Sequence, residues 1–325
     1  MVREVASPRP GVRLKPVGLI DRLKAALSDR YVIDRQVGQG SNALVFLARD
    51  PKYDRQVAIK VLLPDLSASV QSERFLREIQ IAAKLTHPRI LPLYDSGAAD
   101  GLLYYVMPFA EGASLRDRLA RQPKFPIDEA IRIACDVASA LHHAHRQGIV
   151  HRDIKPENVL ISGGEAVVMD FGIARAISVA GGEKLTQTGM TVGTPAYMSP
   201  EQCRGQRELD GRADLYSLAC MLYEMLARRP PFVGATAQEV LARHTMDPVP
   251  RLKAARADVP DAIEKAIVRA LAKKPEDRFA DCGAFAEALS GRPVVLPELP
   301  PASGLAGIWR TLKSMFVRAT RPKWD

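Results

Sequence analysis

The chain has 325 residues, long enough for two packed units, and 47% apolar and 26% charged residues are typical of a globular protein. No run approaches the roughly 18 uncharged apolar residues of a transmembrane helix, and no apolar segment follows the basic N-terminus. Neither a membrane span nor a secretory signal is therefore expected. The cysteines are far apart, which predicts free thiols in a reducing cytoplasm. They are Cys135, Cys203, Cys220 and Cys282.

The net charge of +9 belongs to the two ends of the chain. Residues 1–30 and 291–325 each carry +4, whereas the 260 residues between them hold 33 Lys and Arg against 32 Asp and Glu. Because the body is nearly neutral and no DNA or RNA recognition motif accompanies the basic ends, no nucleic-acid partner is expected.

The N-terminal third predicts strands. Residues 1–20 hold prolines, glycines and scattered basic residues and predict a flexible arm, which a short helix over 21–27 follows. Apolar segments bounded by Gly or Asp-Pro turns then predict strands at 31–37, 43–49, 56–62, 90–95 and 102–108. Ser72 is predicted to cap a helix over 72–85.

The rest of the chain predicts helices, with short strands at 159–161 and 167–169. Apolar residues at helical spacing predict helices over 128–146, 237–244, 261–272 and 282–289. The segment 214–226 is apolar on nearly all sides, which is typical of a helix buried in a lobe. The fold class expected is α+β, with a five-stranded first part and a mainly helical second part, and we find no internal repeat.

A glycine-containing turn and a strand lysine give the first chemical signal. Gly38 and Gly40 lie between two predicted strands, although Ala43 stands where G-x-G-x-x-G has its third glycine. Lys60 ends an apolar strand 18 residues before Glu78, an acid on the predicted helix. A strand lysine held by a helix glutamate provides a fixed cation for nucleotide phosphates.

Two further segments identify the pattern. His151-Arg-Asp-Ile-Lys-Pro-Glu-Asn158 is followed 17 residues after Asp153 by Asp170-Phe-Gly172. With these motifs the sequence resembles the protein kinases, and in detail the bacterial eukaryotic-like (Hanks-type) Ser/Thr kinases. The resemblance implies a bilobal kinase-like domain over 31–289, with a sheet and one main helix in an N-lobe (31–110) and a helical C-lobe (113–289).

The resemblance also implies the catalytic roles. Asp153 would accept the proton of a substrate hydroxyl, and Lys155 would place a cation near the γ-phosphate of ATP. Asn158 and Asp170 would bind Mg²⁺, with Mn²⁺ as an alternative. Lys155 stands two residues after Asp153, which matches the Ser/Thr kinases and departs from the tyrosine-kinase pattern.

The same resemblance implies a nucleotide site, with adenine between Val45 and Ala58 on one side and Leu160 on the other. Met107 matches the gatekeeper, and Pro108 and Ala110 match the hinge, where Pro108 lacks an N–H but only its C=O is needed. The full set of residues implied to bind ATP is Val37, Gly38, Gly40, Val45, Ala58, Lys60, Met107, Pro108, Ala110 and Leu160.

The segment between Phe171 and Pro200 matches an activation loop. Its candidate phosphorylation sites are Thr186, Thr188 and Thr191, with the first two favoured by their spacing, whereas the Thr194 hydroxyl is implied to act beside the catalytic residues. Arg152 before the catalytic aspartate matches relatives that need a phosphorylated loop.

Three residues are implied to brace this site. Glu201 is expected to pair with Arg278 under the end of the activation loop. Asp214, at the start of the apolar helix, is expected to bind backbone N–H groups around His151 and Arg152, since a buried acid needs partners.

Other features have competing interpretations. His142, His143 and His145 invite a metal site, but without nearby carboxylates a packed or solvated helix end is favoured. His87 is expected to be a structural turn residue. Glu157 matches a position that recognises a basic substrate residue in some kinases, which stays open here.

Residues 290–325 predict a Pro-rich linker and a basic amphipathic helix over 304–318, which could dock on the kinase body, a partner or an anionic membrane. Many relatives continue into a membrane span and sensor, which this sequence lacks, so direct sensing of an outside ligand is not expected. A cytoplasmic location follows, with peripheral contact at the inner membrane as an alternative. Protein Ser/Thr hydroxyls, including the chain's own, are the expected substrates, and a pseudokinase scaffold that binds nucleotide without catalysis is the alternative function.

Overall fold

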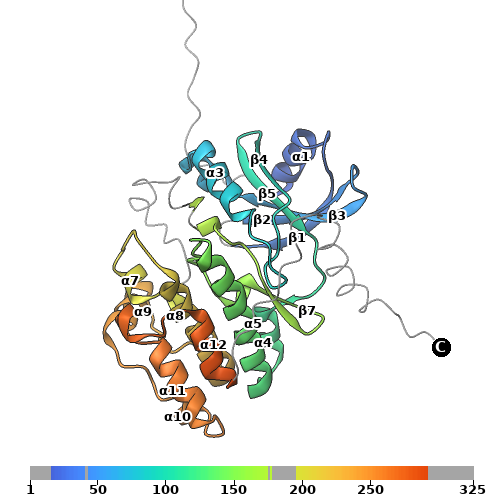
Figure 1. The fold of residues 1–325 in the computed structure, drawn as a ribbon. Coiled ribbons are helices and arrows are strands. Elements are labelled where there is room, and N and C mark those ends of the chain that lie inside the picture. The colour runs from blue at the N-terminus through green and yellow to red at the C-terminus, as the bar shows by residue number, and fades with distance from the viewer. Residues whose placement is uncertain (1–15, 41–42, 175, 178–194, 292–325) are drawn as a thin grey trace, which may run out of the picture. The chain divides into compact units, whose positions relative to one another are not determined.

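The computed structural model describes residues 16–40, 43–174, 176–177 and 195–291 (Figure 1). Contacts between residues divide the chain into two compact units. One comprises residues 1–68 and 95–109, and the other comprises residues 69–94 and 110–325.

The first unit is built on an antiparallel five-stranded sheet in the order β1-β2-β3-β5-β4. Its strands are β1 (Val32–Gln39), β2 (Ala43–Asp50), β3 (Arg55–Leu62), β4 (Asp95–Ala99) and β5 (Leu102–Pro108). Among the inner strands, β5 is apolar throughout and buried at six of its seven positions, and β3 has a buried apolar run from Val57 to Ile59. Such runs are typical of strands that are covered on both faces.

Helix α1 (Pro16–Ala26) packs against this sheet (Figure 1). Leu19, Leu23 and Leu27 recur every fourth residue and are buried, so one face of the helix contributes to the core. An ion pair between Arg22 and Asp100 (2.5 Å) also holds the helix to the β4–β5 turn. The helix expected over 21–27 is therefore longer and belongs to the folded unit. A short helix, α2 (Pro64–Ser69), follows β3 and was not predicted.

The strand predicted over 90–95 was wrong, because β4 begins where it was expected to end. Ile90 makes only an isolated parallel bridge to Val168, and the adjacent backbone donates from Leu91 N to Val168 O (2.9 Å). The apolar segment thus pairs within the second unit. In β4 itself, a Cβ on Gly97 would lie 2.6 Å from the Tyr104 hydroxyl, so a larger residue there would force the buried Tyr104 ring to move.

The second unit is mainly helical. Its longer helices are α3 (Ser72–Ala82), α4 (Leu115–Arg121), α5 (Ile127–Arg146), α8 (Gly211–Ala227), α9 (Ala237–Met246), α11 (Asp261–Ala270) and α12 (Cys282–Ser290). Its shorter elements are β6 (Ala113–Ser114), β7 (Val159–Ser162), β8 (Glu165–Val168), α7 (Pro200–Cys203), α10 (Leu252–Ala255) and the 3₁₀ turns η1 (Pro156–Asn158), η2 (Pro195–Tyr197) and η3 (Pro275–Asp277).

Helices α5 and α8 form the centre of this unit. Helix α8 is buried at every position from Ala213 to Leu226, as its continuous apolar sequence predicts. The buried face of α5 is rich in alanine, which allows close approach to α8, α12 and β8. Both helices belong to a single apolar cluster that makes this unit a rigid support for the loops at its surface.

Two predicted helix features differ from the structure. Helix α3 begins at Ser72, so Gln71 occupies the N-cap position and no side chain caps the helix. The helix ends at Ala82 because the amides of Lys84 and Leu85 turn back over three residues, as in Leu85 N to Ala82 O (3.1 Å).

None of the helices in the described part of the chain is long and apolar enough to span a bilayer. The four cysteines are free, as predicted.

We predict that His87 makes stability depend on pH. Its side chain is buried, with Nδ1 accepting from Arg89 N (3.1 Å). Burial first, and the neighbouring His143 and Arg89 next, lower the pKa of His87 from 6.5 to about 4. The unfolded chain therefore takes up this proton near pH 6.5 while the folded chain does not. The stabilisation that depends on neutral His87 is complete above pH 6.5. As the pH falls toward 4, the free energy of unfolding decreases by up to about 3 kcal/mol.

The substitution His87→Asn should make the free energy of unfolding less dependent on pH, because the amide oxygen can accept the Arg89 N–H but does not titrate. Urea unfolding at intervals from pH 8 to 4.5 measures it, and the comparison at pH 8 isolates any loss of packing. Equal slopes in both proteins would contradict the assignment.

Candidate active site

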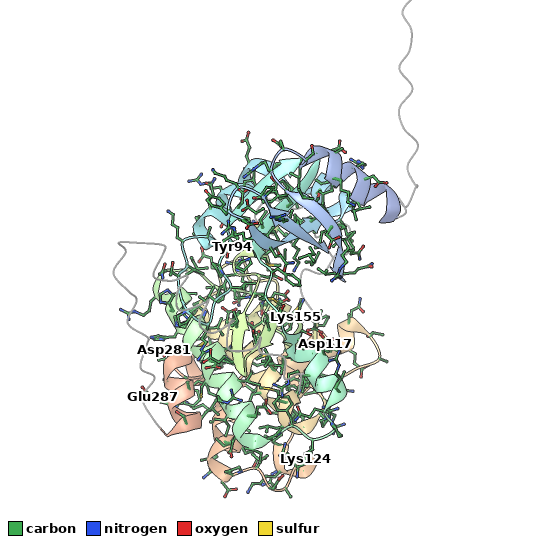
Figure 2. The ribbon with its side chains drawn as sticks, turned by 90° about the vertical axis from the view of Figure 1, so that its right-hand side faces the viewer. Tyr94, Asp117, Lys124, Lys155, Asp281 and Glu287 are labelled. Atoms are coloured by element: carbon green, nitrogen blue, oxygen red, sulfur yellow. The ribbon has the colours of Figure 1, made fainter. Side chains whose placement is uncertain are left out.

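Asp153, Lys155 and Asn158 form a compact polar cluster at the surface of the second unit. Lys155 Nζ lies 2.7 Å from Asp153 Oδ2, and Asn158 Nδ2 donates to Asp153 O (2.7 Å) and Oδ2 (3.1 Å). The Asp153 side chain is 22% exposed and that of Lys155 16%, so the carboxylate is ordered yet accessible. Figure 2 labels Lys155, and Asp117 marks the neighbouring helix α4, which contacts η1.

The segment around Asp170 is tied to the same cluster. Met169 N donates to Asn158 O (2.9 Å), and the Met169 carbonyl lies 2.8 Å from His151 Nε2. The His151 ring meets Phe171 edge-on at 4.7 Å. Asp170 itself has a left-handed backbone (φ 63°), which is rare for a residue with a side chain. The structure thus brings together Asp170 and the segment that carries Asp153.

Asp214, one of the residues expected to brace the site, is fully buried in α8 and accepts three hydrogen bonds. Its Oδ2 accepts from His151 N (2.8 Å) and Oδ1 from Arg152 N (2.7 Å), as predicted. Burial works to raise the pKa of Asp214, but the hydrogen bond and charge of His145 and the amide of His151 outweigh it and lower the pKa. Arg152 has φ 71°, so Asp214 holds a strained backbone in place.

His145 is the third partner of Asp214. Its Nε2 lies 2.7 Å from Asp214 Oδ2, and His142 Nδ1 lies 3.5 Å from Asp281 Oδ1. The expectation that the three histidines lack carboxylate partners was therefore wrong for His142 and His145, because Asp214 lies in α8 and Asp281 caps α12, both far away in the sequence. His145 is packed against Asp214, with 12% of its side chain exposed. No group of three or more metal-binding side chains occurs among the residues that the structure describes.

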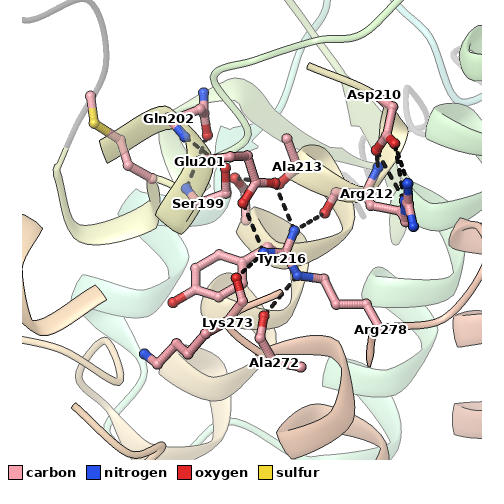
Figure 3. Close-up of polar contacts among 12 residues, drawn as sticks. Ser199, Glu201, Gln202, Asp210, Arg212, Ala213, Tyr216, Ala272, Lys273 and Arg278 are labelled. Carbon is pink, nitrogen blue, oxygen red and sulfur yellow. Dashed lines mark hydrogen bonds and ion pairs between the residues drawn. The ribbon is translucent and has the colours of Figure 1, made fainter. Parts of the chain in front are cut away.

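The predicted pair of Glu201 and Arg278 is a buried, two-pronged ion pair (Figure 3). Arg278 Nη1 and Nη2 donate to the two Glu201 oxygens at 2.7 and 2.8 Å, and the Arg278 and Glu201 side chains are 0% and 6% exposed. Other N–H groups of Arg278 donate to the carbonyls of Arg212 and Ala272, both at 2.8 Å. The guanidinium therefore links α7 to α8 and to the segment after α11.

Gln202 extends this brace to the segment that carries Asp153. Ser199 caps α7, with Gln202 N donating to its hydroxyl (3.4 Å) and Ser199 N donating back to the Gln202 amide (3.0 Å). The Gln202 Nε2 then donates to Arg152 O (2.8 Å). Sequence reasoning missed this contact, although Ser199-Pro-Glu-Gln202 has the spacing of a capping box.

Four residues predicted to bind the nucleotide share one face of the sheet in the first unit. Val45 pairs directly with Lys60, and Ala58 pairs directly with Met107. Because directly paired residues and residues two apart lie on the same face, all four side chains face one way. Pro108 ends β5 and pairs with Val57 at the last position of the β3–β5 ladder.

The glycine turn is closed by Gly40 N, which donates to Ala43 O (2.9 Å). Gly38 pairs opposite Val45, and Val37 precedes it with an exposed side chain. Ala43 lies in β2, paired with Leu62, so its methyl group is accommodated in ordinary strand backbone.

The remaining predicted residues belong to the second unit or lie outside the described residues. Glu78 lies half-buried on α3, and Ala110 and Leu160 belong to the second unit. The pairing of Lys60 with Glu78 stays a prediction. The threonines and the tail helix over 304–318 lie outside the described residues. The threonines are Thr186, Thr188, Thr191 and Thr194.

Comparisons with known proteins agree with this geometry. The family model described as "Protein kinase domain" matches residues 31–290. Serine/threonine-protein kinase PknB of Mycobacterium leprae is 43% identical over 285 residues, which is 84% of this chain and 45% of the relative. PknB of Mycobacterium tuberculosis strain H37Rv is 44% identical over 263 residues, 78% of this chain and 41% of the relative.

A solved structure is similar as well. The crystal structure of a mutant form of the Mycobacterium tuberculosis PknI kinase domain has 33% sequence identity and a TM-score of 0.65, covering 80% of this chain and 94% of that chain. The chain belongs to the protein kinase family, and within it to the bacterial Hanks-type Ser/Thr kinases, as the sequence predicted. It spans less than half the length of the curated PknB relatives.

We predict that breaking the Glu201–Arg278 pair from one side is costly. The substitution Glu201→Gln leaves a buried guanidinium without its counter-charge and should lower the free energy of unfolding by about 3–5 kcal/mol. Glu239→Gln is the matched control, because Glu239 pairs with Arg243 (2.6 Å) at the surface, where a pair contributes at most about 1 kcal/mol. Urea unfolding measures both. Similar losses in the two variants would show that burial does not set the strength of this pair.

Proposed function

We propose that the protein is a Ser/Thr protein kinase, which transfers the γ-phosphoryl group of ATP to Ser or Thr hydroxyls of proteins, including its own. The observation that carries this proposal is the ordered Asp153–Lys155–Asn158 cluster on a braced backbone. The similarity to curated Ser/Thr-protein kinases supports it.

Asp153 is the residue that would accept the hydroxyl proton. The amide of Asn158 and the ammonium group of Lys155 both contact its Oδ2, so the carboxylate has a fixed orientation before a substrate arrives. Lys155 also supplies positive charge where negative charge develops on the transferred group. A kinase needs little covalent chemistry beyond such positioning.

Asn158 and Asp170 fit a divalent cation with a phosphate-bearing nucleotide. Both hydrogen bonds from the Asn158 amide nitrogen go to Asp153, which assigns that nitrogen inward and presents the amide oxygen as a ligand. An amide oxygen and a carboxylate are hard donors that suit Mg²⁺, or Mn²⁺, whose role when bound is to neutralise phosphate charge. Lys60, on the sheet face with Val45, Ala58 and Met107, is proposed to bind the phosphates.

Autophosphorylation at Thr186, Thr188 or Thr191 is part of the proposal, and so is the role of Thr194 at the active site. A doubly charged phosphate can order a loop through charge-assisted hydrogen bonds. We further propose a cytoplasmic enzyme, with residues 304–318 as a peripheral contact for a membrane, supported by their basic amphipathic sequence.

The substitution Asp153→Asn tests the function. It removes the proton acceptor but keeps the shape, so kcat should fall by about 10²–10⁴-fold, with the Michaelis constant for ATP nearly unchanged. Incorporation of radiolabelled phosphate into the protein and into a generic protein substrate measures the rate, and mass spectrometry maps the threonines. Asp117→Asn, at the exposed N-terminus of α4, is the control.

Wild-type activity in Asp153→Asn would refute the role of this residue. If the wild-type protein binds ATP but transfers no phosphate, the nucleotide-binding scaffold becomes the better account.

A further inference from the structure

Arg116 of α4 joins two glutamates that are far from it in sequence. Its Nε donates to Glu157 Oε1 (2.8 Å), and its Nη1 donates to Glu224 Oε1 (2.7 Å). Its Nη2 donates to the Tyr197 hydroxyl, which in turn donates to Glu224 Oε2. All three nitrogens of the guanidinium are therefore engaged by residues from η1, η2 and α8.

Burial and charge show how strongly this arrangement is held. The Glu224 side chain is 8% exposed, whereas Arg116 and Glu157 are 35% and 44% exposed, so one acid lies beneath the guanidinium and the other at the surface. Burial works to lower the pKa of Arg116, but the hydrogen bonds to Glu224 and Glu157 prevail and raise it. Burial and then the charge of Glu224 raise the pKa of Tyr197, which therefore keeps its proton.

The network lies within reach of a chain that brings its hydroxyl group to Asp153. Glu157 follows Asp153 by four residues, and four residues span at most about 14 Å. A polypeptide whose hydroxyl reaches Asp153 extends about 3.3 Å per residue on either side, so a side chain four or five positions away can reach Glu157. Tyr197 belongs to η2, whose following residues connect through Gln202 to the carbonyl of Arg152.

We infer that Arg116 is a specificity-determining residue, which occupies with its own guanidinium the acidic pair Glu157 and Glu224 that would otherwise select an arginine or lysine in the substrate. This inference rests on the proposed kinase function and concerns its substrate class. A guanidinium that meets two carboxylates and a hydroxyl is the arrangement that a bound arginine side chain would adopt. The wild-type enzyme should accordingly tolerate neutral residues beside the phosphorylated hydroxyl.

Removing Arg116 should expose the acidic pair to the substrate. The experiment uses the full chain and peptides with one Ser or Thr, in which arginine replaces alanine at each position within five residues of the hydroxyl. In Arg116→Ala, at least one position should gain about a tenfold preference for arginine in kcat/KM relative to wild type. The ratio between two peptides for one variant does not depend on the fraction of folded enzyme.

Three variants make the assignment specific. Arg118→Ala removes an equal charge from the same helix, but its partner is Glu129 (2.8 Å), so it should keep the wild-type preference. Arg116→Ala combined with Glu157→Gln should lose most of the new preference. If Arg116→Ala does not fold, Arg116→Gln retains hydrogen-bond donors to Glu224 and removes the charge.

Binding of the same fluorescent peptides without ATP, measured by anisotropy, separates this inference from the kinase function. A gain in affinity of Arg116→Ala for an arginine peptide supports the inference if salt and Glu157→Gln weaken that gain. This holds even if no variant transfers phosphate, because the absence of transfer would refute only the kinase function. Unchanged selectivity in Arg116→Ala, in both turnover and binding, would overturn the inference.

Discussion

The buried carboxylate of Asp214 is the constraint on which the proposed active site depends. It accepts the amides of His151 and Arg152 and contacts the ring of His145, all within 2.8 Å. Arg152 has a left-handed backbone that costs about 1–3 kcal/mol for a residue with a side chain. Such a conformation persists only where neighbouring groups hold it. The apolar surroundings of α8 make each of these hydrogen bonds stronger than it would be in water.

From this carboxylate a chain of contacts spreads to both sides of Asp153, the proposed catalytic aspartate. Arg152 is also held through its carbonyl by Gln202, whose helix is locked by the buried Glu201–Arg278 pair. His151 and Asn158 are bonded to the backbone of Met169, immediately before Asp170. The functional side chains are thus positioned by backbone hydrogen bonds and not by one another alone. This is the preorganisation that phosphoryl transfer requires.

The sequence was informative where a motif or an apolar periodicity lies within one short segment. It was less informative where a residue's contact partners are distant in the sequence. The motif around Asp153 and the apolar run of α8 identified the family and the core helix without structural help. Helix α4 was missed although Ser114 and Asp117 have capping spacing, because the helix is short and its apolar residues are few. Residues 90–95 read as a strand because apolar runs carry no information about their pairing partner.

Contacts over long sequence separations could not be foreseen from residue types. Asp214 and His145 are 69 residues apart, and Arg116 and Glu224 are 108 apart. A sequence shows charges at these positions but not that helices bring them together. Glu157 illustrates the consequence, because its position suggested contact with a basic substrate, whereas the structure shows an arginine of the same chain bound to it.

The central claim is that Asp214 holds the backbone of Arg152 for catalysis. Hydrogen exchange of the amides of His151 and Arg152 in wild type and in Asp214→Asn tests it most directly, with the α5 amides as internal reference. Losing acceptors for these amides should speed their exchange by about 10–100-fold while α5 stays protected, and kcat should fall in parallel. Unchanged protection of both amides in a folded Asp214→Asn protein would contradict the account.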